Sequence, residues 1–291
     1  MAGQELLLRA KDISIQFGGL RAVSSFNLDL YQGELIGLIG PNGAGKTTVF
    51  NMLSGVYKPT EGTITFVDRD GKLSVINQKN PAQLNRIGIA RTFQNIRLFG
   101  SLTVEDNVKI ALHQKRMVNP FDVEFRSARF RRDEQLMQEK TGRLLSLFHI
   151  DSFKAELARN LPYGEQRKLE ICRALASEPK LLLLDEPAAG MNEQETAELM
   201  KMISFIRKEF NLTILLIEHD MKLVMGICER LMVLNYGRVI ASGLPQEIQN
   251  NEDVVKAYLG SSFGSSSSRQ DTAGQDDTAE PEGTEGKEES Q

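Results

Sequence analysis

The chain has 291 residues, of which 41% are hydrophobic, and its 35 basic and 39 acidic residues leave a net charge of −4. This composition can bury the core of one large domain, and it lacks the strongly basic balance that is typical of nucleic-acid-binding proteins. The acids gather at the end: residues Gly264–Gln291 carry a net charge of −6 against −4 for the whole chain, which leaves +2 for the rest.

Short apolar or alternating segments predict strands along the chain. In order these are Leu6–Phe17, Phe26–Tyr31, Glu34–Ile39, Thr63–Val67, Ile89–Phe93, Lys180–Asp185, Thr213–Glu218, Leu231–Leu234 and Arg238–Ala241. Helical periodicity and capping residues predict helices between them. The first helix runs from the loop after Ile39 to about Ser54, and the next starts at Pro81 behind Asn80. Most of Thr103–Phe148 is predicted to be helical, with Asp106 beside the cap Thr103. The remaining helices cover Gly164–Ser177, Glu193–Phe210 behind Asn192, and a terminal stretch ending near Leu259. This alternation predicts a mainly parallel sheet covered on both faces, with an antiparallel start and a helical insert.

The remaining composition bounds the compartment and the domain limits. The two cysteines, Cys172 and Cys228, have neither metal-ligand nor disulfide-framework spacing, which indicates a reducing cytosol. No basic signal-peptide start is present and the apolar runs are too short to span a bilayer, so we expect a soluble chain whose membrane contact comes only through a partner. We expect one domain over residues 1–260, a helical subdomain inserted at about 97–165, and a disordered acidic, serine-rich tail over 261–291.

A glycine-rich segment follows the predicted strand Glu34–Ile39 directly. Residues Gly40–Thr47 fit the pattern G-x-x-x-x-G-K-[ST], whose glycines let backbone N–H groups point inward at phosphate oxygens. In this pattern Lys46 reaches the β- and γ-phosphates, the Thr47 hydroxyl ligates Mg²⁺, and Thr48 adds a phosphate contact. The candidate nucleotide-binding residues are therefore Gly40, Asn42, Gly43, Ala44, Gly45, Lys46, Thr47 and Thr48. A plain glycine turn before a helix competes poorly, because the context is strand, loop and helix.

Two acids end another predicted strand, after the apolar run Leu181–Leu184. Ionised carboxylates avoid dry sites unless they are paired, and a bound Mg²⁺ beside Asp185 provides such a partner. Glu186 then lies beside the γ-phosphate, where it can orient or deprotonate the attacking water. Two solvated acids at a strand end are the alternative, and the phosphate loop favours the functional interpretation.

Taken together, these motifs resemble the ATP-binding subunits of ABC transporters over about Leu6–Gly260. The resemblance implies an α/β P-loop NTPase (RecA-like) fold with an antiparallel β subdomain and a helical subdomain. It implies that Gln94 is the Q-loop glutamine, that Ala188–Asn192 is the D-loop, and that His219 is the switch histidine. Without the phosphate loop, Gln94 is interpreted as a surface residue and His219 as a structural one.

The resemblance also implies roles for these residues. Glu186, His219 and Gln94 become the catalytic set, and Thr47, Gln94 and Asp185 the Mg²⁺ set. Phe17, 29 residues before Lys46, corresponds to the aromatic residue that stacks on adenine, with Arg21 and Val23 beside it. By residue pattern alone Phe17 is more typical of a core residue at a strand end.

The segment Leu161–Gln166 corresponds to the family's signature, which contacts ATP held by a second subunit. The resemblance assigns Leu161, Gly164 and Glu165 to that contact. Pro162 replaces the usual serine and Tyr163 the first glycine, so the hydroxyl that touches the γ-phosphate is missing. We expect the composite site that uses this signature to be weaker than its counterpart.

Finer likeness points to the ATPase subunit of branched-chain amino acid importers. The matching segments are Phe17–Val23, Arg91–Phe99, Asp185–Asn192, Ile217–Met225 and the insert near Met117–Arg132. This group implies ATP and Mg²⁺ as cofactors, two permease subunits, a second ATP-binding subunit, an external solute-binding protein, and a peripheral place on the cytoplasmic face of the plasma membrane. Urea and other small-solute importers and lipopolysaccharide exporters are similar.

Rival functions from other classes stay open. A soluble ABC-type ATPase acting on nucleic acid or ribosomes is disfavoured, because the 139 residues between Lys46 and Asp185 hold neither sustained heptads nor a cysteine cluster. The chain also carries one ATPase unit, whereas translation relatives carry two. A non-catalytic nucleotide-binding regulator is disfavoured by the presence of both Asp185 and Glu186.

Overall fold

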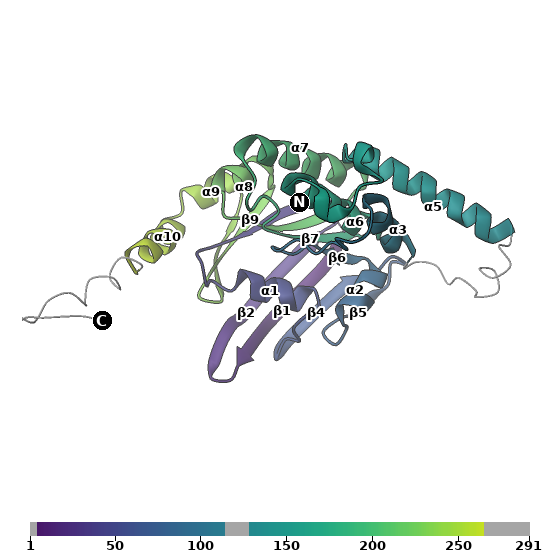
Figure 1. The fold of residues 1–291 in the computed structure, drawn as a ribbon. Coiled ribbons are helices and arrows are strands. Elements are labelled where there is room, and N and C mark those ends of the chain that lie inside the picture. Colours follow the sequence, from purple (N-terminus) through teal and green to yellow (C-terminus); the bar gives the residue numbers. More distant parts are fainter. Residues whose placement is uncertain (1–4, 114–127, 265–291) are drawn as a thin grey trace, which may run out of the picture.

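The structure is a computed structural model that describes residues 5–113 and 128–264. Within those residues the strands form two sheets, one of six strands and one of four (Figure 1). The acidic tail that we predict lies outside the described residues from 265 onward, and so does most of the insert near Met117–Arg132.

The six-stranded sheet has the order β10-β9-β3-β8-β7-β6. Its strands are β3 (Leu35–Ile39), β6 (Ile89–Arg91), β7 (Leu181–Asp185), β8 (Thr213–Ile217), β9 (Arg230–Asn235) and β10 (Arg238–Gly243). All neighbouring pairs are parallel except β9 and β10, so the predicted mainly parallel sheet is confirmed. The carboxyl ends of the five parallel strands therefore meet at one edge, where open α/β sheets bind ligands.

Both faces of the central strands β3, β8 and β7 are buried, which explains why these strands are almost entirely apolar. Along β7, Leu182 and Leu184 pack into one core while Leu181 and Leu183 pack into the other. Helices α6 (Tyr163–Ala176), α7 (Glu193–Glu209) and α8 (Met221–Ile227) contribute to the first core. Helix α1 (Lys46–Leu53) and the second sheet contribute to the other (Figure 1).

The four-stranded sheet is antiparallel, with the order β2-β1-β4-β5. It comprises β1 (Leu6–Phe17), β2 (Leu20–Tyr31), β4 (Glu61–Val67) and β5 (Leu73–Val75). Strand β2 starts six residues earlier than predicted, because Leu20 and Arg21 pair back onto Phe17 and Gln16 across the Gly18-Gly19 turn. Strand β5 is not among the predicted strands, because its three residues are too few for a periodic pattern.

A helical layer connects β6 to α6, as predicted. It contains α3 (Val104–His113), α5 (Ala128–Leu147) and the short helices η1 (Asp151–Phe153) and η2 (Ala158–Asn160). The expected cap is confirmed: the Thr103 hydroxyl donates to Asp106 Oδ2 at 2.7 Å and accepts from the Asp106 N–H at 3.1 Å. The layer packs on α6 and so becomes part of the first core, to which α6, α7 and α8 also contribute.

The other predicted helix starts are also confirmed. Asn80 forms a capping box at the start of α2 (Pro81–Ile87), and Asn192 forms one at the start of α7. The terminal helices are α9 (Pro245–Gln249) and α10 (Glu252–Gly264), so the helical stretch extends past Leu259. Among the described residues, no helix is both long and apolar enough to cross a membrane.

Candidate active site

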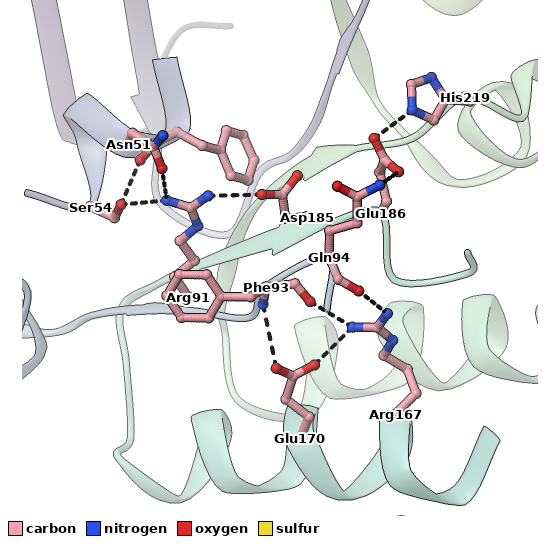
Figure 2. A network of polar contacts seen from close by, with 11 residues as sticks. Asn51, Ser54, Arg91, Phe93, Gln94, Arg167, Glu170, Asp185, Glu186 and His219 are labelled. Carbon is pink, nitrogen blue, oxygen red and sulfur yellow. Dashed lines mark hydrogen bonds and ion pairs between the residues drawn. The ribbon is translucent and has the colours of Figure 1, made fainter. Parts of the chain in front are cut away.

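Four of the predicted site residues, Gln94, Asp185, Glu186 and His219, lie together at the carboxyl edge of the six-stranded sheet (Figure 2). Gly40 follows β3, Gln94 lies shortly after β6, Asp185 ends β7, and His219 lies two residues after β8. Register pairs Asp185 with Ile217 on the neighbouring strand, and the Glu186 N–H donates to the Ile217 carbonyl at 2.9 Å. The topology alone thus brings together residues up to 179 positions apart, Gly40 and His219.

The loop before α1 has the shape of an anion cradle. Gly40, Gly43 and Gly45 have φ values of 148°, 76° and 102°, a region that residues with a side chain rarely adopt. At Gly40 a Cβ atom would lie 2.0 Å from the Leu234 carbonyl oxygen. Because α1 begins at Lys46, the free N–H groups of its first turn lie at the end of this loop. The residues present therefore fit a nucleotide's phosphates.

Lys46 is buried and turns back over the loop. Its Nζ donates to the carbonyls of Gly40 at 2.6 Å and Pro41 at 3.0 Å. Burial lowers the pKa of its ammonium group, and the carboxylates of Glu186 and Asp185 oppose that shift. The opposing carboxylates show that the cation and the two acids share one electrostatic environment. Around it Asn42, Gly43 and Thr47 are exposed, Thr48 is half-buried, and Ala44 is buried.

The β9–β10 turn supports the phosphate loop from beside it. The Gly237 N–H donates to the Ala44 carbonyl at 2.9 Å, and its own carbonyl accepts from the Ser24 N–H at 2.8 Å. A Cβ atom on Gly237 would lie 2.4 Å from the Ala22 carbonyl oxygen, so the close approach requires glycine. One residue thereby connects the phosphate loop to the antiparallel sheet.

The two acids after Leu184 have different surroundings. Asp185 is 3% exposed, and its Oδ2 accepts a hydrogen bond from Arg91 Nη2 at 2.8 Å. Glu186 has a φ of 48°, a left-handed conformation that costs on the order of 1 kcal/mol or more for a residue with a side chain. That turn points its carboxylate out of the sheet, where Oε2 accepts from Gln94 Nε2 at 2.8 Å and Oε1 contacts His219 Nε2 (Figure 2).

A third acid at this edge is structural. Glu218 is buried, and its carboxylate accepts from the backbone N–H groups of Ala188 at 2.8 Å and His219 at 3.2 Å. Burial raises the pKa of Glu218, and these two hydrogen bonds oppose the shift. Glu218 therefore connects the start of the segment Ala188–Asn192 to the backbone of His219.

The signature segment forms the start of α6. The helix begins at Tyr163 with Pro162 as its N-cap, one residue earlier than predicted. The Leu161 carbonyl accepts from Gln166 Nε2 at 2.8 Å, and Glu165 pairs with Lys168 at 2.8 Å. Tyr163 lies against Gly190, where a Cβ atom would be 3.4 Å from its ring, so the start of α6 packs on the segment Ala188–Asn192. Gly164 is buried there, beside α7.

Phe17 ends β1 on the surface, with 44% of the residue exposed. Its ring meets that of Tyr57 edge to face, with centroids 5.2 Å apart. The expectation that Arg21 and Val23 line the same pocket is not supported. Arg21 pairs with Glu61, while Val23 is fully buried and packs beside Gly45, because β2 turns it toward the core.

Several residues of this network were not predicted as site residues. Arg91 binds Asp185, and Arg167 and Glu170 hold the loop that carries Gln94 (Figure 2). A charged pair on the buried face of α6, at i and i+3, is a signal that the sequence contains, since such pairs are rarely buried without a task. Tyr57 and Arg91 carry no comparable local signal.

Comparison with known proteins agrees with the geometry. A family model for the ABC transporter matches residues 23–189, and one for the branched-chain amino acid ATP-binding cassette transporter matches residues 238–264. The high-affinity branched-chain amino acid transport ATP-binding protein LivG of Escherichia coli (strain K12) is 47% identical over 254 residues, which cover 87% of this chain and 98% of that protein. The lipopolysaccharide export system ATP-binding protein LptB of Haemophilus influenzae is 33% identical, covering 88% of this chain and 98% of that protein.

A solved ADP conformation of an ATP-binding cassette from an ABC transporter is also similar, with a TM-score of 0.74, 28% identity, and coverage of 88% of this chain and 99% of that one. The resemblance inferred from the motifs is confirmed by these matches, as is the P-loop NTPase fold with its two added subdomains. The chain belongs to the ABC transporter family, as one of its nucleotide-binding ATPases.

Proposed function

We propose that this chain is the ATP-hydrolysing subunit of a membrane importer for branched-chain amino acids. The observation that carries the ATPase assignment is the carboxylate of Glu186, which is bonded by both Gln94 and His219 at the edge where the phosphate loop begins. The likeness to the branched-chain amino acid transport protein, which extends through the C-terminal segment, favours the solute class. Lipopolysaccharide export is the second candidate, supported by a more distant relative.

The nucleotide site consists of the loop Gly40–Thr48 and Phe17. Free N–H groups at the start of α1 would hold the phosphates, Lys46 would neutralise them, and Phe17 would stack on adenine. Mg²⁺ would be held by the Thr47 hydroxyl, Asp185 and Gln94, because hydroxyl, carboxylate and amide oxygens are its preferred ligands. When bound, Mg²⁺ neutralises charge that develops on the phosphates.

Glu186 is the general base in this proposal. Its carboxylate stands clear of the sheet, so it can accept a proton from a water placed beside the terminal phosphate. Gln94 and His219 already bond its two oxygens and so orient the carboxylate. His219 is about half exposed, which leaves its ring room to turn toward a phosphate oxygen.

A second ATP-binding subunit, identical or not, completes the site. Leu161, Gly164 and Glu165, at the N-terminus of α6, would face ATP bound to that subunit. Pro162 offers no hydroxyl there, so the site that uses this chain's signature is the weaker of the two.

We assign the ATPase domain to residues 1–260, with the helical subdomain at about 97–165 and an acidic tail after it. Two permease subunits, and through them an extracytoplasmic solute-binding protein, are the partners that transport requires. The chain would then sit peripherally on the cytoplasmic face of the plasma membrane, touching the bilayer only through the permease and binding no nucleic acid.

The test of the ATPase assignment is the substitution Glu186→Gln, which keeps the shape and removes the base. Turnover should fall at least a hundredfold while ATP stays bound and the protein dimerises, measured by phosphate release and by size-exclusion chromatography with light scattering. The control is Glu193→Gln, an exposed residue at the start of α7, which should hydrolyse ATP normally. Normal steady-state turnover of the Glu186 variant would exclude the residue as base.

The solute class is tested by uptake of labelled leucine, isoleucine and valine into cells that lack this chain and receive either the parent gene or its Glu186→Gln form. Uptake restored by the parent alone supports the proposal. A defect in outer-membrane lipopolysaccharide with unchanged amino acid uptake would favour the second candidate.

A further inference from the structure

A buried ion pair lies on α6, apart from the residues that face the nucleotide site. Arg167 Nη1 donates to Glu170 Oε2 at 2.8 Å, and the two side chains are 0% and 2% exposed. Arg167 is among the largest fully buried side chains of the described residues. A buried pair of this kind contributes little net stability, since desolvation offsets attraction, and apolar residues of similar size pack as well. Its role must therefore be sought in what else it holds.

Both members hold the backbone of the loop that follows β6. Arg167 donates from Nη1 to the Phe93 carbonyl and from Nη2 to the Gln94 carbonyl, each at 2.8 Å. Glu170 Oε1 accepts from the N–H groups of Phe93 at 3.4 Å and Arg97 at 3.2 Å. Two donors and two acceptors of one short loop are thus matched by one cation and one anion. Figure 2 shows the contacts of this pair with Phe93 and Gln94.

These bonds explain why the strand ends early. The predicted strand runs through Phe93, but β6 ends at Arg91, and Thr92 still donates to the Leu183 carbonyl at 3.0 Å. Beyond that point the loop backbone bonds to α6 instead of to β7. The Phe93 ring remains between the guanidinium groups of Arg91 and Arg97, at 4.9 and 3.9 Å from its centroid. The loop is therefore attached to the sheet by one side chain and to α6 by its backbone.

The same pair lies one turn from the signature. Arg167 Nη2 also reaches the Tyr163 hydroxyl at 3.2 Å, and Tyr163 is the first residue of α6. The backbone carbonyl of Gln94 accepts from Arg167, and the side-chain Nε2 of the same residue donates to Glu186 Oε2 at 2.8 Å. A continuous chain of contacts thus leads from the first turn of α6 to the carboxylate of Glu186.

We propose that Arg167 and Glu170 are positioning residues that form a buried clamp. The clamp makes Gln94 move together with α6. The docking of the signature on ATP held by a partner subunit then sets the distance between Gln94 and Glu186. This inference rests on the proposed roles of Gln94, Glu186 and the signature. Its consequence is that a subunit's own hydrolysis responds to the nucleotide that its partner holds. When the signature is docked, Gln94 is aligned with the carboxylate of Glu186, and when it is undocked, Gln94 is withdrawn from that carboxylate.

The test uses the full-length protein with both charges removed together, Arg167→Met with Glu170→Met. The double variant leaves no unpaired buried charge, although the loop's backbone groups lose their partners, so it should fold and melt below the parent but well above each single substitution. The phosphate loop is untouched, so the Kd for ATP without Mg²⁺ should stay within twofold. The kcat for hydrolysis should fall at least tenfold.

A purely structural role is excluded by combining this double variant with Gln94→Ala. If the clamp acts through Gln94, removing Gln94 from the clamp-free protein should lower kcat by less than twofold further, although Gln94→Ala alone lowers it at least tenfold. Independent, multiplying losses would overturn the clamp while leaving Gln94's own role intact. If Gln94→Ala and Glu186→Gln both leave kcat unchanged, the proposed function fails instead. An unchanged kcat in the double variant also overturns the clamp.

Discussion

The guanidinium of Arg91 and the carboxylate of Asp185 form an ion pair of 2.8 Å whose side chains are 6% and 4% exposed. Arg91 Nη1 also donates to Asn51 Oδ1 at 2.7 Å and Ser54 Oγ at 2.8 Å, both on α1 or directly after it. One arginine thus joins the helix of the phosphate loop to the end of β7. Because Oδ2 of Asp185 is engaged by Arg91, the pair fixes how the carboxylate is presented to the site.

Substituting Arg91→Met leaves Asp185 as an unpaired buried carboxylate. Breaking such a pair costs about 3–5 kcal/mol, which lowers Tm by roughly 6–20 °C for a chain of this size. Differential scanning calorimetry measures the shift. The matched control is Arg9→Met, which breaks the exposed 2.7 Å pair with Asp29 and should shift Tm far less, because solvent screens that pair. Equal shifts for both variants would show that burial of the Arg91 pair is not what matters.

Lys46→Ala should separate stability from binding. Burial lowers the pKa of Lys46, so its ammonium group is held at a desolvation cost, and removing it should not lower the free energy of unfolding. ATP affinity should nevertheless fall at least a hundredfold, since the phosphates lose their buried cation. Calorimetric titration with ATP and thermal melts measure the two effects. Lys58→Ala, at an exposed position after α1, should change neither. Unchanged ATP binding by the Lys46 variant would contradict the phosphate-loop assignment.

Phe17→Ala should weaken ATP binding by the free energy that one stacked base contributes. Alanine substitution of a stacking aromatic costs about 1–3 kcal/mol, or roughly 5- to 150-fold in Kd. Inorganic triphosphate, which has no base, should bind the variant as it binds the parent. Tyr57→Leu, which removes the edge contact to Phe17, should produce a smaller loss of the same kind. Leu20→Ala, 69% exposed in the same hairpin, is the control. An equal loss for triphosphate would place the effect in the fold instead of the base site.

Glu218 predicts a pH dependence of stability. Burial raises its pKa in the folded protein above the ordinary value of 4.5, so between 4.5 and that raised value the folded state binds more protons than the unfolded state. The contribution of Glu218 to the free energy of unfolding is fully present below pH 4.5 and is lost as the pH rises through its pKa in the folded protein. In urea unfolding from pH 4.5 to 8, the free energy of unfolding of Glu218→Gln should therefore rise relative to that of the parent as the pH rises.

The control for that experiment is Glu198→Gln on the exposed face of α7. Its free energy of unfolding should follow the same pH dependence as that of the parent over this range. A constant difference between the Glu218 variant and the parent would mean that burial does not govern the Glu218 carboxyl.

The parts of the site that sequence predicts are those encoded by consecutive residues. The phosphate loop needs three glycines and Lys46 in one stretch, and Asp185 and Glu186 follow an apolar run that can only be a buried strand. Positions further apart became predictable only by resemblance to a family, because nothing around Gln94 or His219 marks them individually.

The sequence could not reveal what depends on tertiary contacts. Arg91 is one arginine among many until the fold places it between Phe50, Phe93 and Asp185. The early end of β6 likewise depends on Arg167, which lies 74 residues from Phe93. Helix α8 is a different kind of omission. Its cap was visible, since Asp220 accepts from the N–H groups of Lys222 and Leu223, but seven residues are too few for a clear period.

The turn at Gly237 has a consequence for how the protein is made. The phosphate loop is synthesised within the first 48 residues, yet its Ala44 carbonyl is held by an N–H group that the ribosome adds almost 200 residues later. Strand β9, which flanks β3 and brings this turn into place, is equally late. A nascent chain therefore carries an unfinished nucleotide site for most of its synthesis, and ATP can stabilise the fold only once the C-terminal hairpin has left the ribosome.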